Sequence, residues 1–509
     1  MSLNSTRNSH LLDDTSEEIS TSKLLSSPSL SSASLSAASL SAASLSSTRS
    51  ENTKEDRGSG IFGACCNFIN CVIGAGIIGT GGAVAESGYA IAMVMLLLCA
   101  LLTKYSLDLL IELGEKYGAS NYEELGYLAY GNAGKKSVIV FKWLYSFGCC
   151  VAYLVVLKKN MNIALADLSG VTIDCPPTST FCSPLLLDEN LFTFLLATFI
   201  VLPLCLHRKL DTLAKFSFIS IVSVLAIVCI VIYEYADVGE NGRGFDKDFL
   251  EVRPGFISSM GTFVFAFVSQ HTSHGVYNSM SERTVGRWKI VSGISILVAG
   301  SMTCLVGSFS YFTYWENTSS DLFTIYPASK LVDSAELLLS VTMLFTYPMP
   351  FFTTRELLVE WCVMRGEARG VGGGADEEGD MRAALLSQEE PLKGGEGPKG
   401  GPSNPMQAYM LPQARPGKGG GYQLLRNYHC ALTILIWGVT LFIALAADSL
   451  GTVLDLVGCV SGSAIAFIIP AAVNIKLEKE CGVRIATMLC VGCFITVMGS
   501  VFSIIKLVN

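Results

Sequence analysis

A glycine-rich stretch near the start of the apolar part of the chain has the spacing of a phosphate-binding turn. Residues 71–82 read CVIGAGIIGTGG, so Gly74, Gly76 and Gly79 form a G-x-G-x-x-G pattern. In a dinucleotide site this turn lies between a strand and a helix, and an acidic side chain about 20 residues further on binds the ribose. The corresponding positions fall in IAMVMLLLCALL, residues 91–102, which contains no acidic residue. The sequence therefore argues against a dinucleotide site.

The same stretch has a second peculiarity, because residues 74–82 contain five glycines. Each glycine costs about 1 kcal/mol relative to alanine in a helix interior. One interpretation is close helix packing through the small pair Ala75 and Gly79. The other is a helix that is interrupted halfway across a membrane, where free N–H and C=O groups need protein, water or a ligand as partners. The second interpretation predicts a binding site at the interruption.

A second stretch has the same character. Residues 259–280 read SMGTFVFAFVSQHTSHGVYNSM, and six polar residues follow one another at 269–274. Six such side chains at bilayer depth are costly unless they line a cavity. Two interrupted spans at corresponding positions of two repeats are typical of secondary transporters and mark the ligand site.

The elements that would position these two stretches are membrane helices. The chain has 509 residues, of which 50% are hydrophobic and 15% charged, and its mean hydropathy is +0.48. Apolar spans of about 20 residues, long enough to cross a bilayer, recur from residue 61 onward. We expect an all-α polytopic membrane protein with eleven transmembrane helices, at about 60–236 (TM1–TM5), 255–475 (TM6–TM10) and 484–506 (TM11). The second interrupted stretch is the sixth span, which predicts two repeats of five helices.

Two polar segments fall outside the spans. Residues 1–58 are Ser-rich and predict a disordered tail without a signal peptide, and residues 365–425 predict a flexible Gly-rich loop. Placing the N-terminus in the cytosol puts most Lys and Arg residues on the cytosolic side. Cys175 and Cys182 then share an exterior loop, where they would either form a disulfide or stay reduced, and Asn317 lies in an exterior glycosylation sequon. The net charge of −8 is not gathered into a basic cluster, so nucleic acid is not an expected partner.

Several stretches together resemble one family of membrane proteins, the amino acid/auxin permeases, and within it the sodium-coupled neutral amino acid transporters. The resemblance runs from about residue 60 to 508. It implies eleven spans in the inverted-repeat architecture of the bacterial leucine transporter, with TM1 and TM6 broken. The stretches that carry it are NFINCVIGAGIIG (67–79), SNYEELGYLAYGNAGK (120–135), GCCVAYLVVL (148–157), FVFAFVSQHTSHGVYNSM (263–280), TYPMPFFTTRE (346–356) and DLVGCVSGSAIAFIIPA (455–471).

The resemblance also implies a substrate site. The amino acid carboxylate would bind the backbone amides of Gly74, Ala75 and Gly76, which agrees with the affinity of helix N-termini for anions. The amino group would meet the TM6 segment, and part of the side-chain pocket would come from nearby aromatic rings. The TM6 residues are Ser269, Gln270, His271 and Thr272, and the rings are those of Phe263, Phe265 and Phe267.

The coupling ion is inferred in the same way. By resemblance, Asn70 and Thr346 supply oxygen ligands to Na⁺. The alternatives are an interhelical hydrogen bond for Asn70 and a bond of Thr346 to its own helix before Pro348. His271 or His274 could instead make transport pH-dependent or proton-coupled, or be a satisfied interior histidine.

Together these observations predict a secondary active transporter, not an enzyme, that moves a neutral amino acid coupled to Na⁺ by alternating access. It needs no cofactor beyond the coupling ion. We expect a monomer in the plasma membrane or a vacuolar or lysosomal membrane. One alternative is an H⁺-coupled transporter or exporter of an acidic organelle, and another is an amino acid sensor that does not transport.

Overall fold

The computed structural model describes residues 59–169, 188–206, 216–237, 250–327, 329–368 and 429–508. By internal contacts the chain divides into Met1–Arg57 and Gly58–Asn509, and every described residue belongs to the second unit. The expected tail, Cys175 and Cys182 lie outside the described residues, as does most of the expected loop. The last described helix before that loop ends at Ala368, close to the predicted start of the loop at about residue 365.

The described residues form helices and one isolated β-bridge, between Ser59 and Met280. The helices are α2 (Ile61–Val72), α3 (Gly76–Ser87), α4 (Tyr89–Tyr117), α5 (Tyr122–Ser169), α7 (Glu189–Leu196) with η1 (Ala197–Val201) and α8 (Leu202–Leu206), α9 (Phe216–Asp237), α10 (Phe256–Phe265), α11 (Gln270–Ser279), α12 (Val285–Tyr314), η4 (Trp315–Asn317), η5 (Leu322–Ile325), α13 (Lys330–Thr346), α14 (Pro348–Ala368), α18 (His429–Ala446), α19 (Leu450–Val457) with η7 (Gly458–Gly462), η8 (Ala464–Ile468) and α20 (Ile469–Glu478), and α21 (Val483–Phe494) with η9 (Ile495–Gly499) and α22 (Ser500–Val508).

Nine helices of the described part are long and apolar enough to cross a membrane, and α2 and α3 form a tenth, bent span. Large apolar side chains such as Phe199, Leu297 and Phe442 are exposed along these spans, as expected for helices that face lipid. The pair α10 and α11 occupies the position of the predicted sixth span, but α11 is too polar to resemble an ordinary one (QHTSHGVYNS). The structure is consistent with eleven spans, although that number stays a prediction.

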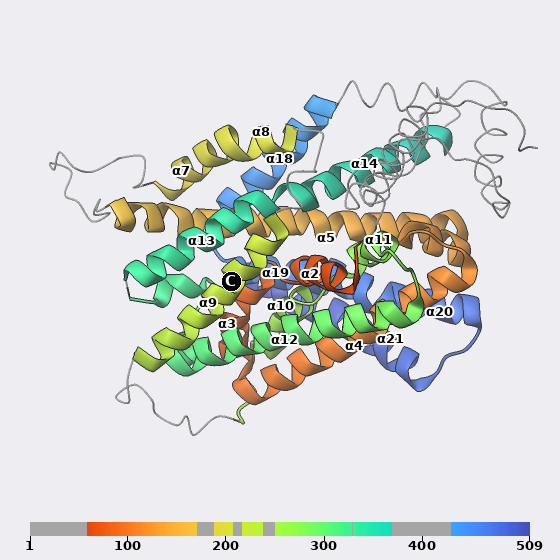
Figure 1. Cartoon of the computed structure of the whole chain (residues 1–509), viewed down its shortest axis with the longest axis horizontal. Helices are drawn as coiled ribbons and strands as arrows, with labels where there is room; N and C mark the ends of the chain where they lie inside the picture. Colours follow the sequence, from red (N-terminus) through yellow and green to blue (C-terminus); the bar gives the residue numbers. More distant parts are fainter. Residues whose placement is uncertain are drawn as a thin grey trace, which may run out of the picture. The chain divides into compact units, whose positions relative to one another are not determined.

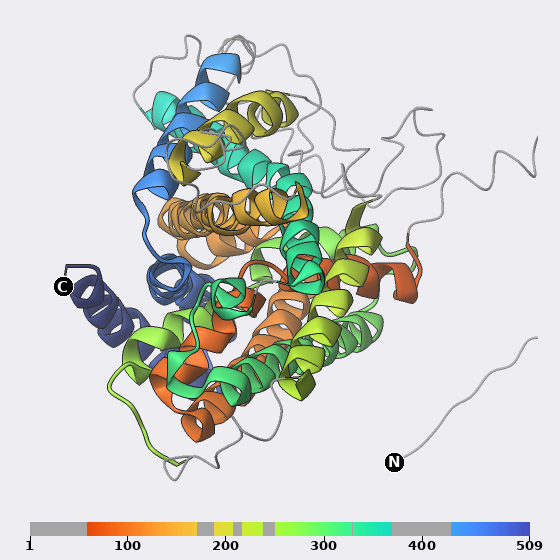
Figure 2. The same cartoon turned by 90° about the vertical axis from the view of Figure 1, so that its left-hand side faces the viewer.

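Both predicted interruptions are present. The axes of α2 and α3 differ by 51° across residues 73–75, and α10 and α11 are separated by residues 266–269. Figures 1 and 2 show α2 and α3 between α5 on one side and α12 with α4 on the other. The close packing of α12 against α2, α3 and α4 fixes one side of the interrupted helices, and α13, α14 and α18 pack on the far side of α5.

Glycines let the interrupted helices approach their neighbours. A methyl group added to Gly76 would lie 2.7 Å from the Cα atom of Ala266, so the two interruptions touch each other at this point. A methyl group on Gly261 of α10 would lie 2.0 Å from the carbonyl oxygen of Asp455, and one on Gly458 would lie 1.9 Å from that of Gly261. The backbones of α10 and α19 are therefore in direct contact, which only glycine permits.

We predict that Gly76→Ala destabilises the protein, because the added methyl group must push the backbone of Ala266 aside. Overpacking of this kind costs about 1–3 kcal/mol. Gly438→Ala is the matched control, since it adds the same methyl group inside α18 with no atom within 4 Å. Thermal unfolding of the purified proteins in detergent should show a lower melting temperature for Gly76→Ala only. Equal melting temperatures for the two variants would contradict the contact between the interruptions.

Candidate functional site

The first interruption leaves main-chain donors without helical partners. Among the described residues, the N–H groups of Gly74 and Ala75 donate no backbone hydrogen bond, and Gly76 begins α3, where an N–H group has no partner within its own helix. The next two donors are used, because the N–H of Ile77 bonds to the carbonyl of Gly74 and that of Ile78 to the carbonyl of Ala75. The structure thus brings the three predicted residues together at the start of a helix.

In the second interruption, several polar side chains bond to their own segment. The hydroxyl of Thr272 donates to the carbonyl of Ser269 at 3.0 Å, and that of Ser269 donates to the carbonyl of Phe267 at 3.3 Å. The Gln270 side-chain oxygen accepts the N–H of Ser269 at 3.0 Å. The buried Nε2 of Gln270 and Nδ1 of His271 have no partner among the described residues. Of the four predicted residues, Gln270 and His271 therefore keep polar atoms available for a ligand.

The two interruptions lie against each other. Besides the contact of Gly76 with Ala266, α11 packs against α2. The N-termini of α3 and α11 and the C-termini of α2 and α10 consequently meet in one region. Helix N-termini attract negative charge and helix C-termini attract positive charge. This arrangement suits a ligand that carries both charges, without any Asp or Glu in either interrupted stretch.

Two tyrosines of α5 border the site, and the sequence reasoning missed both. The hydroxyl of Tyr145 donates to the carbonyls of Phe265 and Val268, at 3.4 and 3.2 Å, and so bonds acceptors that the interruption sets free. The hydroxyl of Tyr153 lies 3.1 Å from where a side chain on Gly74 would begin. Tyr145, Cys149 and Tyr153 are spaced i, i+4 and i+8, which places them on one face of a helix. That spacing was the available signal.

The three phenylalanines of the second interruption are buried but do not share one direction. The ring of Phe265 lies 5.3 Å from that of Tyr145 on α5, whereas the ring of Phe267 lies against Gly300 on α12. Phe263 is fully buried. Of the three rings, Phe265 is the one that the structure places beside the tyrosine that borders the site.

The two predicted sodium ligands lie at helix ends. Asn70 is buried in the last turn of α2. Thr346 is the last residue of α13, and its hydroxyl donates to the carbonyl of Thr342 at 2.7 Å, which is the local bond weighed as the alternative. An oxygen that donates in this way still has lone pairs for a cation. Because α2 packs mainly on α9, α11 and α12, and α13 mainly on α5 and α9, the structure does not show the two residues as one site.

His274, on α11, contacts residues of α4 and α5. Its ring stacks on that of Tyr122, with centroids 6.2 Å apart. A methyl group added to Gly114 would lie 3.1 Å from the His274 Nε2 atom. Neither ring nitrogen has a hydrogen-bond partner among the described residues. Close by, Lys142 and Glu123 form an ion pair of 2.6 Å that is largely buried. This histidine packs between α4 and α5.

Comparison with known proteins gives the same architecture. A solved structure of a nucleobase-cation-symport-1 family transporter, in a closed conformation with bromovinylhydantoin bound, matches with a TM-score of 0.50 over 89% of this chain and 91% of its own, at 10% sequence identity. At this identity the likeness shows the fold alone, which is that of transporters with the leucine-transporter architecture.

Relatives in sequence cover most of the chain. A rat protein named "Putative sodium-coupled neutral amino acid transporter 11" is 28% identical over 418 residues, which are 82% of this chain and 78% of the relative. The zebrafish (Danio rerio) protein of the same name is 27% identical over 87% of this chain and 85% of its own. Vacuolar amino acid transporter 2 of Saccharomyces cerevisiae is 23% identical over 90% and 85%.

The family model described as "Transmembrane amino acid transporter protein" matches residues 57–508. This match includes both interruptions, the two tyrosines of α5 and every described span. The chain belongs to the transmembrane amino acid transporter family, whose members are transporters and not enzymes.

Proposed function

We propose that the protein is a secondary active transporter that moves a neutral amino acid across a membrane by alternating access, coupled to Na⁺. The observation that carries this proposal is the meeting of the two interruptions at Gly76 and Ala266. Four helix ends of both polarities surround that point. A zwitterion can bind there through its carboxylate and its amino group, as the leucine-transporter architecture does with discontinuous helices.

A neutral substrate fits the charges around the site. The interrupted stretches contain no Asp, Glu, Lys or Arg, so the substrate side chain meets no opposite charge there. The carboxylate would take the amides of Gly74, Ala75 and Gly76. The amino group would donate to Oε1 of Gln270, to the unprotonated ring nitrogen of His271 and to main-chain carbonyls of this segment, and Ser269 and Thr272 would contribute through their backbone.

The coupling ion is proposed on two grounds. Asn70 and Thr346 supply neutral oxygen ligands, and the rat and zebrafish relatives carry "sodium-coupled" in their names. The yeast relative is named for the vacuole, and His271 lies at the site, which together favour H⁺ coupling in an acidic organelle as the second candidate. We propose a monomer with its N-terminus in the cytosol, in the plasma membrane or a vacuolar or lysosomal membrane.

Flux into proteoliposomes should identify both substrate and ion. We expect accumulation of at least one neutral amino acid from a radiolabelled panel when a Na⁺ gradient is imposed. Accumulation driven only by an H⁺ gradient would show that the coupling ion is H⁺ and not Na⁺. Saturable binding of an amino acid without accumulation under any gradient would contradict transport and favour the sensor.

The sodium assignment predicts a specific loss. Asn70→Ala and Thr346→Val each remove one oxygen ligand, so we expect the Na⁺ concentration for half-maximal flux to rise by about tenfold, equivalent to about 1.4 kcal/mol. Thr346→Ser keeps the hydroxyl and should retain the parent value. Sodium activation that is unchanged in Asn70→Ala and Thr346→Val removes both residues from the site.

Tyr145 predicts an effect on substrate affinity. Tyr145→Phe leaves the carbonyls of Phe265 and Val268 without their donor, which costs about 1–3 kcal/mol of stability and loosens the segment that binds the amino group. We expect a higher KM for the amino acid in flux assays.

Tyr122→Phe is the matched control for this effect. The Tyr122 hydroxyl is also buried, but it donates to the carbonyl of Ile465 on η8, at 2.9 Å, and not to an interruption. Both variants should melt at lower temperature, but only Tyr145→Phe should raise KM. An equal rise in KM in both variants would mean that Tyr145 has only a structural role.

A further inference from the structure

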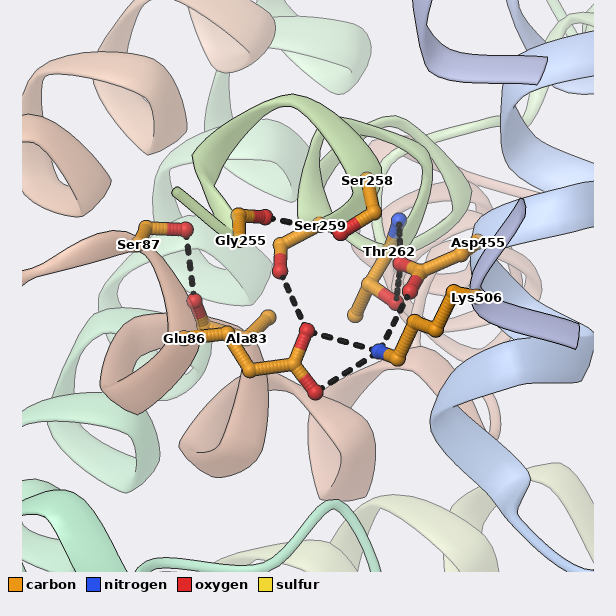
Figure 3. Close-up of polar contacts among 9 residues, drawn as sticks. All are labelled: Ala83, Glu86, Ser87, Gly255, Ser258, Ser259, Thr262, Asp455 and Lys506. Atoms are coloured by element: carbon orange, nitrogen blue, oxygen red, sulfur yellow. Dashed lines mark hydrogen bonds and ion pairs between the residues drawn. The ribbon is translucent and has the colours of Figure 1, made fainter. Parts of the chain in front are cut away.

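A cluster of charged side chains joins four helices at the end of the spans where α3 ends and α10 begins. The ammonium of Lys506 on α22 lies 2.7 Å from both carboxylate oxygens of Glu86 on α3 and 3.3 Å from Oδ2 of Asp455 on α19. From α10, Ser259 donates to Glu86 at 2.8 Å and Thr262 donates to Asp455 at 2.7 Å. Figure 3 shows the carboxylates of Glu86 and Asp455 converging on the Lys506 nitrogen. We call Glu86, Asp455 and Lys506 the triad.

One ammonium serves two carboxylates in the triad, and the carboxylates belong to different helices. The side chain of Asp455 is only 2% exposed, whereas those of Lys506 and Glu86 are 30% and 33% exposed. A buried charge that loses its partner is strongly unfavourable. The buried charge of Asp455 therefore needs the Lys506 ammonium as its partner as long as this end of the protein is closed.

The helices on the Glu86 side form one unit. The N–H of Arg253, just before α10, donates to the carbonyl of Ser87 at the end of α3, and its guanidinium donates to the carbonyl of Ala85 at 2.7 Å. These bonds tie the second half of the first interrupted helix to the first half of the sixth. Movement of α3 away from α19 would therefore carry α10 along.

Among the described residues, no other ion pair joins this unit to α19. The seam includes the close glycine contacts of Gly261 and Gly458 and the packing of Leu454 on Gly79. The triad closes the end of this seam, and the only cation in it comes from the last helix, which lies outside the two predicted repeats.

We propose that Lys506 is a gating residue for transport: it latches α3 and α10 to α19, and its release is required for the seam at this end to open. The last helix, through the Lys506 side chain, then controls how often the seam opens and lets substrate reach the central site from this side of the membrane. The inference depends on the protein being a transporter and not on which amino acid or ion it carries.

Distance measurements between two spin labels test the latch without any substrate. The labels replace Val252, which is exposed and precedes the Arg253 tie, and Asp448, which is exposed in the turn before α19. The full-length chain is used in nanodiscs. Cysteines introduced at these two positions carry the labels, and the native cysteines are replaced. We expect one short distance to dominate in the parent protein.

Lys506→Met should add a longer distance, with the ratio of open to closed populations rising by about tenfold or more, whereas Lys506→Arg should keep the parent distribution. Lys479→Met is the matched control, since Lys479 is exposed and follows the span Leu450–Glu478 at the end opposite to Asp455. A folded Lys506→Met protein with the parent distribution would overturn the proposal, and so would an equal shift in Lys479→Met.

If Lys506→Met does not fold, Glu86→Gln decides the question. It weakens the hold of Lys506 on α3 while leaving Asp455 paired. We then expect a smaller shift toward the longer distance, and a distribution identical to that of the parent would overturn the latch.

Discussion

The interior of a membrane offers no water to a free peptide group, and this constraint shapes the whole site. A helix that stops at residue 72 and restarts at residue 76 must find partners for its main-chain groups within the protein. The structure provides some of them, because the second interruption lies against the first and the Tyr145 hydroxyl bonds the carbonyls of Phe265 and Val268. The donors of Gly74 and Ala75 stay available, and they are the groups that a carboxylate would bond.

The same constraint explains why small residues recur where interrupted helices cross their neighbours. A helix end can be reached by another main chain only if no side chain stands between them. Gly76 allows this at Ala266, and Gly261 with Gly458 allows it between α10 and α19. The glycines of the first interruption thus permit close contacts, with Ala266 at Gly76 and with Leu454 at Gly79. Helix packing and helix interruption, which the sequence presents as alternatives, occur together.

Local patterns predicted the spans and the interruptions, because hydropathy and glycine content act within a few residues. They could place the two tyrosines on one helix face but could not predict their partners, or the triad, because those contacts join residues distant in sequence. Thr262 and Asp455 are 193 residues apart, and Glu86 and Lys506 are 420 apart. In the sequence, Lys506 looks like an ordinary basic residue at the end of a last apolar span. Its role depends on which carboxylates the packing brings beside it, and no local pattern carries that information.

The structure separates two kinds of electrostatics along the spans. At the interruptions, ligand charge is met by helix ends and neutral oxygens, which hold a zwitterion without fixed charge. At the triad, full charges meet around the buried carboxylate of Asp455, which is costly to leave without its partner. Weak, neutral contacts suit a site that must release what it binds. A charge pair of this kind suits a seam that is held closed until the pair separates. The position of the charges therefore follows from what each region has to do during one cycle of transport.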